Sequence, residues 1–407
     1  MPTMNDKIMH HSDDPEDLRD WLLSQHDSFG RGTLFFDAFA RQLILRGVPA
    51  DRMTLHMRQL NPGLRARSFH WSRDSGGAIE VKRGHGVEKH EDYIHSPVRD
   101  IFEGGDTNKV IERRLDRHKD PKDYPVLLDL KHQGYVHYLM LPVPLWILGP
   151  AALSIATRHT DGFSQRHLDI LESSLKAFGT ALELQETRRL ARTLLDTYVG
   201  HDAGERILRG SILRGDSEAV HAVLFYCDLR NFTPLSESKP LPHVIELLDR
   251  YFETVGKCLT DAGGEILKFI GDGILAIFPC PEGHTYHCTA CKQALGAAQA
   301  AQAAMAKRRK EEDDFDLTCG IALHVGDVRF GNVGTTDRLD FTVIGPAVNM
   351  VTRIEPFSKK TKDRIVVSAD FAERESDVNY RSLGKFPLKG IGDWKEILTT
   401  ESASAAD

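Results

Sequence analysis

Two apolar runs in the second half of the chain each carry one aspartate where a strand is expected to end. The first is Val223–Thr233, VLFYCDLRNFT, in which Asp228 precedes an Asn-Phe-Thr turn. The second is Ile266–Pro279, ILKFIGDGILAIFP, in which Asp272 occupies a Gly-Asp-Gly tip. The pattern predicts two buried strands, the second of which bends into a hairpin at its aspartate. An isolated Asp-Gly is usually only a turn, so these aspartates gain a chemical role only if the fold brings them together.

Two carboxylates at adjacent strand ends suit a pair of hard divalent cations. Mg²⁺ prefers a few carboxylates plus substrate phosphates over a cage built entirely from protein. Two such ions can lower the pKa of an attacking hydroxyl and screen a polyphosphate leaving group. The residues therefore favour a nucleotidyl-transfer enzyme.

A third stretch, Asp340–Glu355 (DFTVIGPAVNMVTRIE), makes this interpretation more specific. Together with F-x-x-D-x-x-x-F-T, K-x-x-G-D-G, the G-x-A-x-x-x-G run at Gly320–Gly326 and G-x-V-G at Gly331–Gly334, it forms an ordered set of motifs. Over residues 217–400 the chain resembles the catalytic domain of the class III adenylyl and guanylyl cyclases. One such motif would be weak, but the set in order is specific. The resemblance implies an α+β fold with a ferredoxin-like catalytic domain.

The resemblance also implies a set of metal ligands. Asp228, Asp272 and the Leu229 carbonyl match the positions that hold two metal ions per site, Mg²⁺ or Mn²⁺. The ribose 3′-hydroxyl of the nucleotide would attack its α-phosphorus in line, and pyrophosphate would leave.

Further matching positions imply contacts to the sugar and the phosphates. Asn349 would orient the ribose, and Arg353 would contact the α-phosphate in the transition state. These two residues are four apart, so they project from one face of a helix, and a planar guanidinium can bridge two phosphate oxygens. Arg338 and Lys389 match positions that hold the β- and γ-phosphates. Outside such a motif, each would read as an ordinary surface residue.

Lys268 and Thr342 match the positions that contact the base. A lysine can donate to the ring N1 of adenine, and a threonine oxygen can accept from its exocyclic amine, whereas guanylyl cyclases resemble one another in a Glu and a Cys at these places. A buried polar mismatch with the wrong base is costly. The resemblance therefore implies ATP as the substrate, with a guanylyl cyclase as the alternative within enzymes.

In this family the aspartates and the Asn/Arg pair of one site come from different subunits. Because one sequence carries Asp228 and Asp272 together with Asn349 and Arg353, the resemblance implies a head-to-tail homodimer with two equivalent sites. A catalytically silent nucleotide-binding regulatory protein is the alternative from another class. Silent domains normally lose one of these residues, which this chain keeps.

The N-terminal region has an α+β order that is similar to the GAF-type sensor fold. Helical spacing covers Pro15–Leu45, with a break near Gly30–Gly32, and short strands and a hairpin are expected up to residue 160. The region's histidines leave a bound haem, a metal or a pH response open as the N-terminal ligand or signal, but no pair has a ligand spacing. They are His70, His85, His90, His95, His118, His132 and His137.

A long helix is expected from the N-cap Ser164 to Tyr198, stopped by Gly200. Its apolar stripe can pair with a second subunit as a coiled coil or pack against its own N-terminal domain. The predicted organisation is a GAF-like regulatory domain, a signalling helix with linker, a nucleotidyl cyclase domain and a disordered tail. Their bounds are residues 1–160, 161–216, 217–400 and 401–407.

Composition predicts a reducing cytosol as the location of this chain and argues against nucleic-acid-binding and disulfide-rich secreted proteins. A net charge of −7 argues against nucleic-acid binding, which usually needs a basic surface. Six cysteines in 407 residues are too few to indicate a disulfide-stabilised secreted protein. The N-terminus lacks a signal-peptide profile. The apolar stretch Tyr138–Ala156 is long enough for a bilayer, but its prolines and Gly149 favour a hairpin, so no membrane insertion is expected.

A cysteine and histidine cluster follows the second aspartate motif in the sequence CPEGHTYHCTAC. The spacing of Cys280, Cys288 and Cys291 is loosely zinc-like but fits known sites poorly. Cys288 and Cys291 are expected to be small core residues of an Ala-rich helix.

Overall fold

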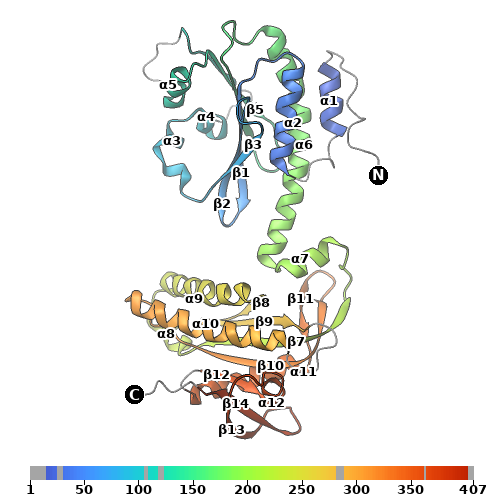
Figure 1. Cartoon of the computed structure of the whole chain (residues 1–407), viewed down its shortest axis with the longest axis vertical. Helices are drawn as coiled ribbons and strands as arrows, with labels where there is room; N and C mark the ends of the chain where they lie inside the picture. Colours follow the sequence, from blue (N-terminus) through green and yellow to red (C-terminus); the bar gives the residue numbers. More distant parts are fainter. Residues whose placement is uncertain are drawn as a thin grey trace. The chain divides into compact units, whose positions relative to one another are not determined.

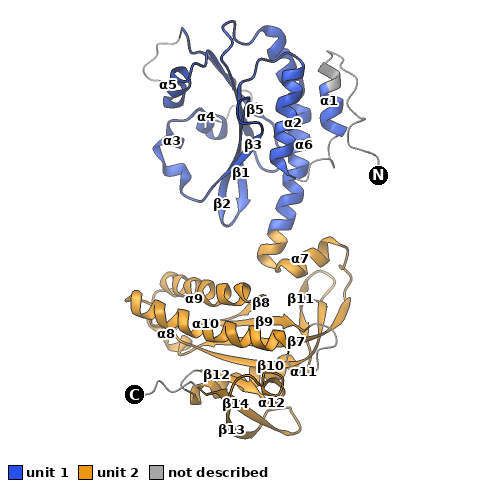
Figure 2. Ribbon diagram, in the orientation of Figure 1, with its two compact units in different colours: residues 1–193 blue, residues 194–407 orange. Residues whose placement is uncertain are grey.

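The computed structural model of the chain describes residues 15–24, 31–104, 109–117, 123–280, 288–361 and 364–401. The chain divides into two compact units, residues 1–193 and residues 194–407 (Figure 2). Each unit has its own sheet and its own apolar cores, so each is described by itself.

The first unit is built on an antiparallel six-stranded sheet with the order β3-β2-β1-β6-β5-β4. The strands predicted in this region are confirmed. Helix α2 begins at Gly32, within the predicted break, but Gly30 lies outside the described residues. The elements are α1 (Pro15–Ser24), α2 (Gly32–Leu45), β1 (Arg52–Asn61), β2 (Leu64–Ser72), β3 (Ala78–Arg83), η1 (Val87–Lys89), α3 (Glu91–Ile94), α4 (Pro97–Glu103), β4 (Ile111–Arg114), α5 (Pro125–His132), β5 (His137–Val143), β6 (Ala151–Thr157) and α6 (Gln165–Tyr198).

The sheet of the first unit is covered on both faces, as Figure 1 shows, with α2 and α6 on one face and α3, α4 and α5 on the other. Along β5, Leu139 and Leu141 belong to the core under α2 and α6, whereas Tyr138 and Met140 belong to the core under α4 and α5. Because alternate side chains enter two different cores, the whole strand is buried and reads as a continuous apolar run. The predicted β5–β6 hairpin is confirmed. Among the helices in the described part of the chain, none combines the length and apolar character of a membrane span.

Helix α6 follows Ser164, whose Oγ accepts a hydrogen bond from the His167 N–H at 3.4 Å. Its first half packs into the core of the first unit, and Glu186 forms a buried ion pair with Arg67 at 2.7 Å. Further along, Tyr198 is exposed, and Gly200 takes a positive φ of 100° that favours glycine. Of the two uses expected for this helix, packing against its own domain is observed, and the coiled coil stays a prediction.

The second unit contains an eight-stranded sheet with the order β13-β14-β12-β10-β7-β9-β8, and β11 pairs with β10 outside this path. The succession β7-α9-β8-β9-α10-β10 with the spatial order β10-β7-β9-β8 is a ferredoxin-like β-α-β-β-α-β arrangement. The elements are α7 (His201–Leu208), β7 (Ser217–Leu229), α8 (Phe232–Ser238), α9 (Leu241–Asp261), β8 (Glu265–Ile270), β9 (Gly273–Pro279), α10 (Thr289–Glu311), β10 (Cys319–Gly334), β11 (Leu339–Ile344), α11 (Pro346–Ile354), η2 (Glu355–Lys360), β12 (Ile365–Ser368), α12 (Ala369–Ala372), β13 (Tyr380–Pro387) and β14 (Trp394–Thr400).

Two helical layers enclose the central strands of this sheet. Val223 and Phe225 of β7 enter the core formed with α9 and α10, and Ala222 and Leu224 enter the core on the side of α11. Burial on both faces explains why the strand before Asp228 is apolar at nearly every position. The polar residues that follow it therefore lie at the rim of a rigid sheet.

Candidate active site

Strands β7 and β9 bring the two predicted aspartates to the same edge of the sheet. The strands pair antiparallel with Cys227 opposite Ile274, so Asp228 lies beside the β8–β9 tip that carries Asp272. Gly273 permits this approach, because a Cβ there would lie 3.2 Å from Asp228 Oδ1 and 2.8 Å from the Tyr226 hydroxyl. The Gly-Asp-Gly sequence thus makes room for a carboxylate of the neighbouring strand.

The aspartate pair concentrates negative charge in a partly dehydrated place. Burial, the Asp272 carboxylate and the Glu355 carboxylate raise the pKa of Asp228 to about 6. Burial also raises the pKa of Asp272, although backbone hydrogen bonds from Asp272 itself and from Leu229 act in the opposite direction. Two such carboxylates repel each other, and a divalent cation between them would attract both. The site therefore fits a hard metal ion.

The donor set for such an ion is incomplete within the protein. In the described ranges, no cluster of three or more His, Cys, Asp or Glu side chains is suited to a metal ion. A cation at Asp228 and Asp272 would need further oxygens from backbone carbonyls, water or substrate phosphates, which is the coordination that Mg²⁺ prefers.

The residues expected to contact the base lie on β8 and β11. Lys268 Nζ donates to Asp340 Oδ2 at 3.1 Å, which joins the two strands. Thr342 lies two residues beyond Asp340, so both side chains point to the same side of β11. The Thr342 side chain is largely buried, with 7% exposure, whereas Asp340 on the same side is exposed.

The residues expected to contact the ribose and phosphates lie around α11. Asn349 is exposed and Arg353 half-buried on this helix. A Cβ at Gly390 would lie 3.3 Å from the Arg353 guanidinium, so the loop that carries Lys389 lies against Arg353. Arg338 is exposed in the β10–β11 turn, where its N–H donates to Thr335 Oγ1 at 3.1 Å.

Two sets of site residues lie close together within one chain. Asp228 lies beside the tip that carries Asp272, and Arg353 lies against the Lys389 loop. Across the described part of the chain, no hydrogen bond or ion pair links either aspartate to Lys268, Arg338, Thr342, Asn349, Arg353 or Lys389.

Comparison with known proteins relates residues 216–400 to a family. The sequence pattern of the adenylate and guanylate cyclase catalytic domain matches residues 216–400. Residues 216–400 are therefore similar to a cyclase catalytic domain.

Curated relatives match the cyclase domain over part of their length. An adenylate cyclase of Anabaena cylindrica is 35% identical over 157 residues, which are 38% of this chain and 30% of that protein. Adenylate cyclase 1 of Rhizobium meliloti (strain 1021) is 29% identical over 194 residues, 44% of this chain and 29% of that protein. The chain thus spans less than a third of these relatives. The crystal structure of the adenylyl cyclase CyaB from P. aeruginosa is 24% identical with a TM-score of 0.42, covering 47% of this chain and 98% of that one.

The second unit also contains a buried polar cluster that the sequence does not predict. Arg230 and Glu355 form an ion pair with little exposure, and Arg230 Nη2 also donates to Ser358 Oγ. Glu355 raises the pKa of Asp228 and Arg230 lowers it, so this cluster contributes to the charge around Asp228. Gly320 pairs with Asp228 across the ladder, and a Cβ at Gly320 would overlap all three members of the cluster.

We expect Gly320→Ala to impair both stability and catalysis. The added methyl must displace the buried Arg230–Glu355–Ser358 cluster, so the free energy of unfolding should fall by about 1–3 kcal/mol. Displacement next to Asp228 should also lower turnover by about tenfold or more. The matched control is Gly296→Ala on α10, where a Cβ meets open space. Thermal unfolding and initial rates of both variants test this, and an unchanged Gly320→Ala protein would contradict it.

The cysteine cluster after β9 is only partly described. Cys288 and Cys291 are buried in the core of α10, as expected, and Cys280 Sγ lies 3.1 Å from Cys288 Sγ. His284 and His287 lie outside the described residues. Among the residues that are described, the cluster offers no metal-binding group.

Proposed function

We propose that the chain is an adenylyl cyclase that converts ATP to 3′,5′-cyclic AMP and pyrophosphate. The observation that carries the proposal is the Asp228–Asp272 pair at one sheet edge of a cyclase catalytic domain. The curated relatives named above are adenylate cyclases, which supports ATP as the nucleotide.

The substrate's own 3′-hydroxyl is the nucleophile, so the protein acts by positioning and by charge. Asn349 orients the ribose, and Arg353 contacts the α-phosphate as negative charge develops in the transition state. Lys389 and Arg338 hold the terminal phosphates, which become the pyrophosphate leaving group. The closeness of the Lys389 loop to Arg353 supports a single phosphate-binding region.

Asp228 and Asp272, with the Leu229 carbonyl, are the proposed ligands of two Mg²⁺ or Mn²⁺ ions. When bound, these ions supply Lewis acidity, which makes the ribose hydroxyl more acidic and offsets phosphate charge. The aspartates hold this charge at the rim of a rigid sheet, beside the reacting phosphate. The dehydrated, mutually repelling carboxylates support this role.

Lys268 and Thr342 are proposed to select adenine, and the wild-type protein is expected to prefer ATP. The assay is full-length protein with ATP or GTP and Mg²⁺ or Mn²⁺, with chromatographic separation of the cyclic products. We expect kcat/KM for ATP to exceed that for GTP by at least about tenfold, and the Lys268→Glu/Thr342→Cys variant to erode that ratio. A higher kcat/KM for GTP would make the chain a guanylyl cyclase. Absence of both products would favour the silent nucleotide-binding alternative.

The active form is proposed to be a head-to-tail homodimer in which each site is shared. Large apolar side chains are exposed on the edge strand β8, where Phe269 is 52% and Ile270 45% exposed. Exposed apolar residues beside a functional site are typical of a subunit interface.

The N-terminal region is proposed to be a GAF-like regulatory domain, residues 1–160, followed by a signalling helix and linker at 161–216. The cyclase domain would then occupy 217–400 and a tail 401–407. The six-stranded sheet with helices on both faces and the 34-residue α6 support this organisation. The proposed location of the chain is the cytoplasm.

A further inference from the structure

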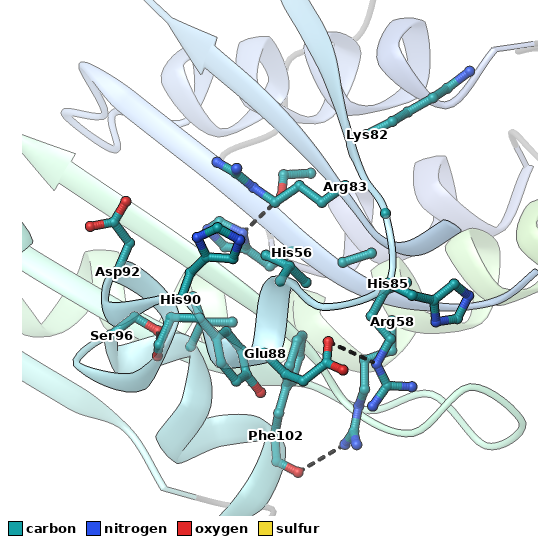
Figure 3. A pocket seen from close by; sticks show the side chains of 17 residues that line it. His56, Arg58, Lys82, Arg83, His85, Glu88, His90, Asp92, Ser96 and Phe102 are labelled. Carbon is teal, nitrogen blue, oxygen red and sulfur yellow. Dashed lines mark hydrogen bonds and ion pairs between the residues drawn. The ribbon is translucent and has the colours of Figure 1, made fainter. Parts of the chain in front are cut away.

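A cavity in the first unit lies between the strands β1, β2 and β3 and the segment 84–102, which contains η1, α3 and most of α4 (Figure 3). Its volume is about 400 Å³. A second hollow of about 440 Å³ adjoins it and shares His56, Arg83 and Asp92 with it. Cavities of several hundred Å³ accommodate small organic molecules.

The first lobe is basic although the protein as a whole is acidic, with a net charge of −7. Its charged lining comprises the bases Arg58, Arg65, Lys82 and Arg83 and the acids Glu88 and Asp92. Glu88 is 4.0 Å from Arg65, a long ion pair. Neither Lys82 nor Arg83 has an ion-pair partner among the residues that the structure describes. Uncompensated cations around a hollow favour an anion.

Arg58 is held in place for such a contact. Its Nη2 donates to the Phe102 carbonyl at 2.8 Å, and its guanidinium lies 4.9 Å from the centre of the Phe102 ring. The Arg58 Nε is buried and has no hydrogen-bond partner within the described ranges. A buried unsatisfied donor costs free energy, so it points to a missing acceptor.

The floor of the cavity is polar and neutral. His56 Nδ1 lies 2.9 Å from Ser68 Oγ, and the His56 and His70 rings meet edge to face at 6.0 Å. Burial and the neighbouring positive groups lower the pKa of His56 to about 3, so its ring is uncharged. His70 Nε2, in the second lobe, is buried and lacks a partner among the described residues. The His56 and His70 rings can therefore form hydrogen bonds with an uncharged polar group of a ligand.

We propose that this cavity binds a small organic anion. Its carboxylate or phosphate lies against Arg58, Arg65 and Arg83, and an uncharged polar part lies against His56 and His70. Residues 84–102 line one side of the cavity, so a ligand there contacts both this segment and the sheet. This inference specifies which kind of ligand the proposed regulatory domain would bind. Binding of the anion does not depend on whether the chain is a cyclase.

The test is calorimetric titration of the full-length protein with glucose 6-phosphate, citrate and inorganic phosphate. Glucose and the trimethyl ester of citrate are the uncharged controls, and none of the probes is a nucleotide. We expect saturable binding of glucose 6-phosphate or citrate and no binding of the uncharged controls. Whichever of the two anions binds more tightly shows whether phosphate or carboxylate is the preferred group. Lys82→Gln/Arg83→Gln should weaken this binding by about tenfold or more.

Lys89→Gln is the matched control, because Lys89 is exposed on η1 but does not line the cavity. It should bind like the wild type. Equal weakening by Lys89→Gln would indicate a general surface effect and overturn the proposal. Binding of inorganic phosphate alone, binding that survives Lys82→Gln/Arg83→Gln, or no binding of any anion would overturn it too. Turnover with ATP is measured separately, so an inactive protein that still binds the anion refutes only the cyclase assignment.

Discussion

Asp228→Ala and Asp272→Ala are each expected to lower cyclic nucleotide formation by at least about 10³-fold. Each removes a proposed ligand of the metal ions whose charge stabilises the transition state. Folding should not suffer. The two carboxylates are partly desolvated next to each other, and removing Asp272 relieves the repulsion that raises the pKa of Asp228. The melting temperature without metal should therefore be unchanged or higher. Initial rates with Mg²⁺ and Mn²⁺ and thermal unfolding measure the two effects.

The matched control for these variants is Asp249→Ala, an exposed aspartate on α9 in the same domain. It should retain wild-type turnover. Asp228→Asn separates charge from shape, because the amide keeps the volume but is a poor ligand for Mg²⁺. Near-wild-type turnover of either alanine variant, with metal present, would refute the assignment of the aspartates as metal ligands.

The strands and the hairpin around Asp228 and Asp272 could be predicted because their signals are local. Strand periodicity, the Gly-Asp-Gly tip and the four-residue spacing of Asn349 and Arg353 all lie within short stretches of sequence. The meeting of the two aspartates depends on strand pairing, which the cyclase resemblance implied and the β7–β9 register agrees with.

The Arg230–Glu355 ion pair could not be predicted, since it joins residues 125 positions apart. The need for glycine at position 320 also depends on residues far away in the sequence, because the missing Cβ makes room for side chains from two other segments. The N-terminal cavity was also missed. The sequence draws attention to His70, His85, His90 and His95 but not to His56. Histidine spacing does not reveal a cavity whose lining comes from β1, β2, β3 and several short helices. Short helices such as α3 are set by tertiary contacts rather than by a periodic pattern.

Mixing two inactive variants provides the decisive test of the shared site. In a head-to-tail heterodimer of Asp228→Ala and Arg353→Ala, one site carries both substitutions and the other site carries neither. A one-to-one mixture forms heterodimers as about half of its dimers, each with one of two working sites, so its activity should approach about a quarter of wild type. Each variant alone should be silent. Subunit exchange followed by initial-rate measurement gives the result.

The control for this experiment is a mixture of Asp228→Ala with Asp272→Ala. Both lesions then affect the same half of the site, so every heterodimer carries one defective aspartate in each of its two sites and no activity should return. Recovery in the first mixture and silence in the second require that the aspartates and Arg353 of one site come from different subunits. If mass spectrometry detects the Asp228→Ala/Arg353→Ala heterodimer and it is still inactive, the site is contained within one chain. In that case the exposed apolar residues Phe269 and Ile270 on β8 would need a different partner.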